Sequence, residues 1–214
     1  MSMNPSITAP GLFFLAGLTF TLICGLVMAA KALGDKRDLF FAAPRGDKNQ
    51  AARYSLTWGM APWKKETAYR HWPTYVAGIG FHAGIFLGFA WTVVHILSFP
   101  LPAWTRQFSA LALGLAALLG LAIFVKRLAL AKMRALSNPD DYFSNLLVTT
   151  FLILSALALH RTRLVPLLLI WTGIMLFYLP LGKLRHALFF VPTRVLLGRY
   201  FGCRGTWPKA RSVS

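Results

Sequence analysis

Five long apolar runs divide the chain, and its charged residues lie almost entirely between them. Each run approaches or exceeds the roughly 18–20 residues that a helix needs to cross the hydrocarbon core of a bilayer. The first run is too long for a signal-peptide core and has no basic segment before it, so we predict that it is retained. The pattern predicts an all-α integral membrane bundle, a single membrane domain over residues 1–214. The predicted transmembrane helices cover about 10–30, 72–99, 108–125, 142–159 and 164–184.

The composition excludes an ordinary soluble domain. Of the 214 residues, 57% are hydrophobic and 14% are charged, against roughly 25% charged residues in typical globular chains. The net charge of +17 would suggest nucleic acid if the basic residues followed amphipathic segments. They lie instead between apolar runs, which is typical of membrane proteins. We therefore predict contact with membrane lipid and no nucleic-acid partner.

The basic residues also predict the orientation of the chain. Of the 23 lysines and arginines, all but three lie in the 31–71 connection, the 126–141 connection or the segment after residue 182. The three exceptions are Arg106, Arg161 and Arg163. By the positive-inside rule the N-terminus lies outside and the C-terminus in the cytoplasm, which requires an odd number of spans. The prediction is a multi-pass protein of the cytoplasmic (inner) membrane, with a cytoplasmic loop at 31–71 and a cytoplasmic tail at 185–214.

Two histidines are the main candidate functional residues, because an ionisable group within the membrane is costly and usually functional. His82 lies about ten residues into the second run, roughly 15 Å of helical rise from its cytoplasmic end. His186 follows the fifth run, so both fall in the cytoplasmic half. Two neutral imidazoles at similar depth can supply both axial ligands of a b-type haem iron. Lys183 and Arg185 can then pair with the haem propionates. The alternative is that each histidine only joins helices by hydrogen bonds.

The predicted helix over 72–99 has two unlike faces. Glycines spaced four residues apart, at Gly80, Gly84 and Gly88, favour close packing of another helix. The residues within about 60° of His82 form an apolar face that can wall a macrocycle; they are Gly78, Ile79, Ile85, Phe86 and Phe89.

The remaining histidines have weaker assignments. His71 precedes the second helix and is predicted to be interfacial. His95 lies on the glycine side, about 140° around the helix from His82, and both His95 and His160 are predicted at the outer side. A second haem held by His95 and His160, solvation at the outer interface, and a quinone contact by His95 are alternatives. The sequence has neither a Cys-x-x-Cys-His motif nor a cysteine cluster, which excludes covalent c-type haem and an iron–sulfur centre of the usual kind.

Three stretches resemble a known family of membrane cytochromes. YVAGIGFHAGIF at 75–86 resembles the second helix of the gamma subunit of respiratory nitrate reductase. LPLGKLRHALFFVP at 179–192 resembles that family's fifth helix and its exit from the membrane. WGMAPWKKE at 58–66 is more similar to the branch associated with sulfite reduction, heterodisulfide-reductase-like complexes and some hydrogenases. The other three helices match only in hydrophobicity.

The resemblance implies a haem b subunit of a quinone-linked oxidoreductase. Such subunits pass electrons between menaquinone or ubiquinone and a cytoplasmic iron–sulfur subunit of the same complex. His82 and His186 match the ligands of the haem nearer the cytoplasm. Thr92 and Leu168 stand roughly where the family has the histidines of an outer haem, so one haem is expected. The alternative function is a haem-free anchor or assembly subunit.

Aromatic residues among the basic ones suggest a place for the partner. The 31–71 loop carries Trp58 and Trp63, and the tail carries Phe201 and Trp207. Aromatic residues and arginine are enriched in protein interfaces. We predict that the 31–71 loop and the 192–214 part of the tail form one docking surface for the iron–sulfur subunit. The competing explanation is that the basic residues only orient the chain in the membrane and attract anionic lipid.

Overall fold

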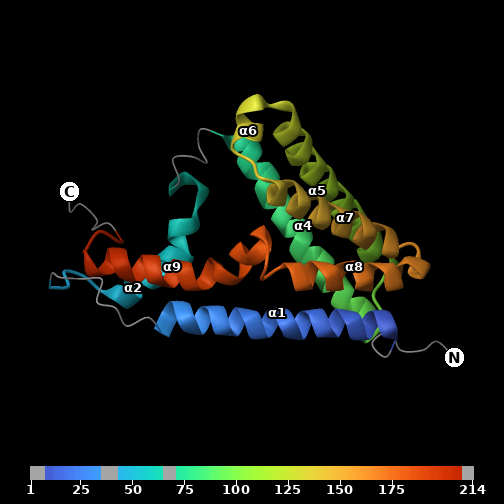
Figure 1. The fold of residues 1–214 in the computed structure, drawn as a ribbon, viewed down its shortest axis with the longest axis horizontal. Coiled ribbons are helices and arrows are strands. Elements are labelled where there is room, and N and C mark those ends of the chain that lie inside the picture. Colours follow the sequence, from blue (N-terminus) through green and yellow to red (C-terminus); the bar gives the residue numbers. More distant parts are fainter. Residues whose placement is uncertain (1–7, 35–42, 65–70, 209–214) are drawn as a thin grey trace. The chain divides into compact units, whose positions relative to one another are not determined.

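A computed structural model describes residues 8–34, 43–64 and 71–208. Glu66, part of one of the stretches that carry the resemblance, lies outside the described residues, as do Lys65 and Arg70 of the predicted basic loop. The described part of the chain is helical and contains no strand (Figure 1). This confirms the predicted all-α class.

Within the described residues, four helices are long and apolar enough to cross a membrane, and they correspond to the first four predicted runs. They are α1 (Ala9–Gly34), α4 (Trp72–Leu97), α5 (Ala103–Ala129) and α7 (Pro139–Ala158). Short elements connect α5 to α7 and α7 to α8, namely α6 (Ala131–Ala135) and η4 (Thr162–Leu164). Several apolar helices of this length indicate a multi-pass membrane protein.

The fifth predicted span is not one continuous helix, so that prediction was wrong in detail. Helix α8 (Val165–Tyr178) has 14 residues, which rise about 21 Å, less than the roughly 30 Å of a bilayer core. The chain then turns at 179–182 before η5 (Lys183–Arg185) and α9 (His186–Cys203). Pro180 brings no amide hydrogen to a helix, and the amide of Gly182 closes the turn on the Tyr178 carbonyl at 2.9 Å. Helices α8 and α9 pass as a fifth span only when taken together as a broken pair.

The chain divides into two compact units. The first consists of Met1–Leu22 with Pro73–Leu184, and the second of Ile23–Trp72 with Arg185–Ser214. Helix α1 thus contributes its first half to one unit and its second half to the other.

The glycine face of α4 packs closely against α5 and α7 in the first unit. A Cβ added to Gly88 would lie 2.8 Å from the ring of Phe151 on α7, and one added to Gly84 would collide with the Cβ of Ala116 on α5. A Cβ at Gly80 would likewise meet a leucine of α5. The prediction that these glycines serve helix packing is therefore confirmed. Phe151 and Leu152, which these added Cβ atoms would approach, are fully buried.

The first half of α1 packs against α8, also through small residues. A Cβ on Gly17 would lie 2.9 Å from the carbonyl oxygen of Gly173. The hydroxyl of Thr21 donates to the carbonyl oxygen of Leu176 at 2.5 Å. Because a hydroxyl in an apolar environment needs a partner, this bond fixes the register of the two helices.

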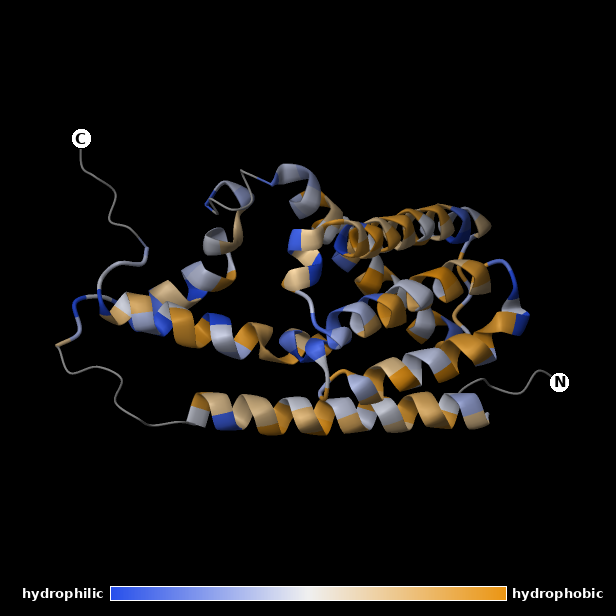
Figure 2. Ribbon diagram, turned by 45° about the horizontal axis from the view of Figure 1, so that its top comes forward, coloured by the Kyte–Doolittle hydropathy of each residue, from blue (hydrophilic) through white to orange (hydrophobic). Residues whose placement is uncertain are grey.

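Large apolar side chains remain exposed along the long helices of the first unit. On α5 the exposed residues Leu111, Leu115 and Leu118 share one face. Figure 2 shows orange, the colour of hydrophobic residues, along the long helices. Patches of this extent are unfavourable in water but match hydrocarbon chains, so the outer faces of these helices are suited to lipid contact.

In the second unit, α2 (Lys48–Leu56) lies against α9. A Cβ on Gly198 would be 2.5 Å from the Cα of Ala52, and one on Gly202 would be 2.5 Å from the Cβ of Ala51. Asp47 caps the start of α2, accepting hydrogen bonds from the amides of two following residues. Two short turns follow α2, η2 (Trp58–Met60) and η3 (Pro62–Lys64). The predicted loop and the predicted tail therefore pack on each other through backbone contacts.

Candidate functional site

The imidazole of His82 is oriented by its own helix. Its Nδ1 lies 2.7 Å from the carbonyl oxygen of Gly78, one turn earlier on α4. A carbonyl oxygen can only accept, so Nδ1 carries the proton and donates it. Nε2 is then the nitrogen that carries the lone pair. Histidines that ligate metals are commonly held in this way, with the second ring nitrogen donating to a carbonyl or carboxylate.

The face of α4 around His82 is only partly used for packing, since Ile85 and Phe89 on it pack against the core while other residues stay exposed. His82 is exposed, as are Ile79 and Phe86 beside it. A Cβ on Gly78 would meet nothing within 4 Å, in contrast to the glycines on the other face. Of the apolar face predicted to wall a macrocycle, Ile79 and Phe86 are therefore exposed, whereas Phe89 contributes to the core through its contact with Phe151.

The second predicted ligand belongs to the other compact unit. His186 is the first residue of α9, immediately after the short turn η5, and its side chain is exposed. Arg185 precedes it in the N-cap position of the helix. The two predicted ligands thus belong to different compact units. The pairing of His82 with His186 stays a prediction.

Lys183, predicted to contact a propionate, makes an ion pair with Asp141. The same carboxylate lies 3.3 Å from the guanidinium of Arg127. The Asp141 side chain is only 3% exposed. The second oxygen of Asp141 accepts from the amide of Asn138, while the Asn138 side chain accepts from the amide of Asp141. This carboxylate therefore joins the end of α5, the start of α7 and the turn after α8.

The cluster of Asp141 with Arg127 and Lys183 was not predicted from the sequence, although a signal for part of it exists. The segment from Asn138 to Asp141 has the spacing of a capping box ahead of an apolar run, which marks a helix start. Which cations would meet the carboxylate could not be deduced, because they come from distant parts of the chain.

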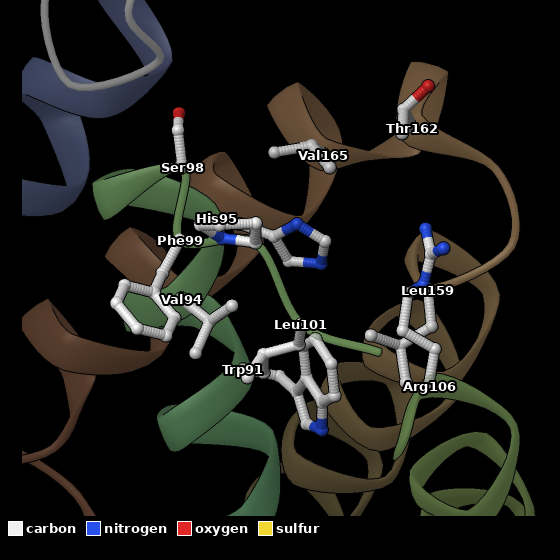
Figure 3. Close-up of a pocket in the computed structure, with 11 residues that line it drawn as sticks. Trp91, Val94, His95, Ser98, Phe99, Leu101, Arg106, Leu159, Thr162 and Val165 are labelled. Carbon is white, nitrogen blue, oxygen red and sulfur yellow. The ribbon is translucent and has the colours of Figure 1, made fainter. Parts of the chain in front are cut away.

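His95 lines a cavity of about 490 Å³ at the C-terminal end of α4. Helix α4 ends there because Ser98 adopts a φ of +51°, a left-handed conformation that reverses the chain. The segment Phe99–Leu101 then passes along the cavity toward α5. Arg106 of α5, Thr162 and Val165 also line it. Figure 3 shows the His95 imidazole near the centre and the Arg106 guanidinium approaching from α5.

Neither ring nitrogen of His95 makes a hydrogen bond to another residue of the described chain, and its Nε2 is buried. The ring lies 6.1 Å from the indole of Trp91, centroid to centroid, at 45°. Trp91 is one helical turn before His95, so the two rings form one wall. His95 was a candidate from the sequence, but its neighbours Trp91 and Arg106 were not predicted.

His160 does not line the cavity around His95. It is exposed and lines a separate hollow of about 510 Å³ with Gln107 and Leu157. The two cavities share no residue, so the structure does not bring His95 and His160 around one space.

The two positions that correspond to an outer haem in the resembling family are filled by the core. Thr92 and Leu168 are both fully buried. The hydroxyl of Thr92 donates to the carbonyl oxygen of Gly88 at 2.9 Å, within α4. Neither side chain is a usual ligand of haem iron.

No family model, curated protein or solved structure matches the chain. Among the described residues, no group of three or more histidine, cysteine or acidic side chains is arranged to hold a metal ion. A haem iron with two histidine ligands does not require such a group.

Proposed function

We propose that this protein is a haem b-containing membrane subunit of a respiratory redox complex. It would transfer electrons between the quinone pool and a cytoplasmic iron–sulfur subunit. The observation that carries the proposal is the hydrogen bond from His82 Nδ1 to the Gly78 carbonyl. Because Nδ1 donates to the helix's own backbone, Nε2 is the nitrogen whose lone pair a haem iron would take, beside the exposed Ile79 and Phe86.

The residues of this chain would supply ligands and surroundings. His82 and His186 would provide the two axial nitrogens, and the Gly78 carbonyl would fix the tautomer of the first. Ile79 and Phe86 would keep water from the macrocycle. The haem, when bound, supplies the one-electron redox chemistry.

The cations near His186 would favour the anionic propionates. Arg185 is adjacent in sequence, and Lys183 and Arg127 share a single carboxylate, Asp141. In this proposal Arg185 contacts a propionate directly, while Lys183 stays paired with Asp141 and contributes through its positive charge.

The proposed iron–sulfur partner would dock on the second unit. Helix α2 and helix α9 pack closely, and Trp207 contacts Phe201 with ring centroids 4.6 Å apart. Trp58 is 66% exposed and Trp63 is 72% exposed. Large exposed indoles beside basic residues suit an interface with an acidic partner. They also suit the headgroup region of a membrane, so the docking assignment needs its own test.

A second candidate is a haem-free anchor or assembly subunit. The ion pair between Lys183 and Asp141 favours it, because one predicted propionate partner already has a structural role. In that case His82 and His186 would have only packing roles.

The reduced-minus-oxidised spectrum of the purified protein distinguishes the two candidates. The cytochrome proposal expects a b-type alpha band, with one haem per chain by pyridine haemochrome assay. A protein that is folded by circular dichroism, was produced with haem available, and shows no such band would be the haem-free subunit.

A further inference from the structure

The cavity around His95 has the composition of a site for an apolar ligand with one polar group. Its walls are mostly apolar, with Val94, Phe99, Leu101, Leu159 and Val165 among them. Its volume of about 490 Å³ lies within the roughly 300–1,000 Å³ of small-molecule pockets. A space of this kind accepts a ring and part of a chain.

The polar groups at the cavity are few and carry no negative charge. His95 presents an imidazole whose nitrogens bond to no other described residue, and Arg106 adds a guanidinium. A buried polar nitrogen without a partner costs free energy that a ligand can recover. The missing partner is an oxygen that accepts or donates a hydrogen bond.

The location of the cavity further limits the chemical class of its ligand. It lies where two membrane-spanning helices, α4 and α5, end and begin. Trp104 is 62% exposed in the first turn of α5, and exposed tryptophans of this kind favour the membrane interface. A ligand reaching this place from the lipid phase is itself lipid-soluble.

From these observations we infer that the cavity binds the ring of an isoprenoid quinone, with His95 hydrogen-bonded to one ring oxygen. The indole of Trp91 lies along the ring, and the guanidinium of Arg106 faces the polar edge. This inference assigns a quinone site within the proposed electron-transfer function and rests on it only for the redox role of the quinone. His95 lies thirteen residues after His82, about 20 Å along α4, so the two residues can be altered independently.

The first test measures binding of a one-isoprene menaquinone analogue to the protein in phosphatidylcholine nanodiscs, with empty nanodiscs as background. His95→Leu should weaken binding about three- to tenfold, the loss expected for one hydrogen bond. His160→Leu, which alters the other cavity, should bind as wild type does. His95→Gln keeps a hydrogen-bonding group and should bind more tightly than His95→Leu. Equal binding by wild type and His95→Leu overturns the inference.

The second test needs no variant. An azido derivative of the same quinone should label wild-type protein within residues 91–106 or 159–165. Labelling confined to other segments overturns the inference, as does complete displacement of the quinone when the nanodiscs contain phosphatidylglycerol, since the cavity would then be a lipid site.

Haem content separates this inference from the proposed function. If His95-dependent binding occurs in a protein without haem, the quinone site stands and the cytochrome proposal fails. If haem is present and His95→Leu does not change quinone binding, the cytochrome proposal stands and the quinone site at His95 is contradicted.

Discussion

His82 donates a hydrogen bond from Nδ1 to the carbonyl oxygen of Gly78 at 2.7 Å. Gly78 lies on the same face of α4 and offers no side chain above the imidazole. The bond therefore holds the ring in one tautomer. A bond of this kind from the second ring nitrogen is expected of a histidine that ligates a metal through Nε2.

Removing either predicted ligand should remove the haem. We expect His82→Ala and His186→Ala to lose the b-type alpha band, because an iron with one remaining protein ligand is held weakly. His71→Ala alters a histidine outside both candidate positions and should keep the band. Pyridine haemochrome assays on protein of matched circular dichroism measure the effect. Full haem in His82→Ala would show that another residue is the ligand.

A methyl group on the glycine face of α4 should destabilise the bundle. Gly84→Ala places a Cβ against Ala116, and overpacking of this kind costs about 1–3 kcal/mol. The matched control is Gly114→Ala on α5, where a Cβ meets nothing within 4 Å. Thermal unfolding in detergent should give a lower midpoint for the first variant alone. Equal midpoints for both variants would mean that the α4–α5 contact is looser than described.

Neutralising Asp141 should weaken the first unit. Asp141→Asn removes a nearly buried carboxylate from Arg127 and Lys183, at a cost of about 1–3 kcal/mol because Lys183 is half exposed. Asp140→Asn removes the neighbouring charge at the same helix start and serves as the control. The two variants are compared by their unfolding midpoints, and a larger loss for Asp140→Asn would contradict the ion-pair assignment.

Replacing exposed indoles of the second unit should release the proposed partner. Trp58→Ala combined with Trp63→Ala removes two side chains that are mostly exposed, so the fold and the haem band should persist. Trp104→Ala, an equally exposed indole of the first unit, is the control. Co-purification from the native membrane measures the effect, and complete retention of the partner by the double variant would place docking elsewhere.

The start of α2 should lose stability in acid. Hydrogen bonds from the amides of Gln50 and Asn49 lower the pKa of Asp47 below its ordinary 3.8. A carboxyl whose pKa is lower in the folded state stabilises fully above the unfolded pKa, and this contribution is lost as the pH falls through the lowered value. Hydrogen exchange of the Asn49 and Gln50 amides should therefore quicken below pH 3.8, relative to the change in unstructured peptide. Asp47→Asn keeps an acceptor but does not titrate, so it should lack this acid dependence.

The sequence by itself determined the membrane class, the first four long helices and the packing role of the α4 glycines. Each depends on local composition or on the helical period, which a single stretch of chain reveals. The sequence also identified His82, since an ionisable residue in an apolar helix is conspicuous wherever it lies.

Only the tertiary structure decided the break after α8, the contact of α2 with α9, the partners of Asp141 and the neighbours of His95. The hydropathy of Leu179, Leu181 and Leu184 concealed the turn at Pro180, because an apolar window does not register a missing amide hydrogen. The cavity beside His95 is formed by three helices and a left-handed Ser98. Such features arise from residues far apart in the chain, so no periodicity within one segment can reveal them.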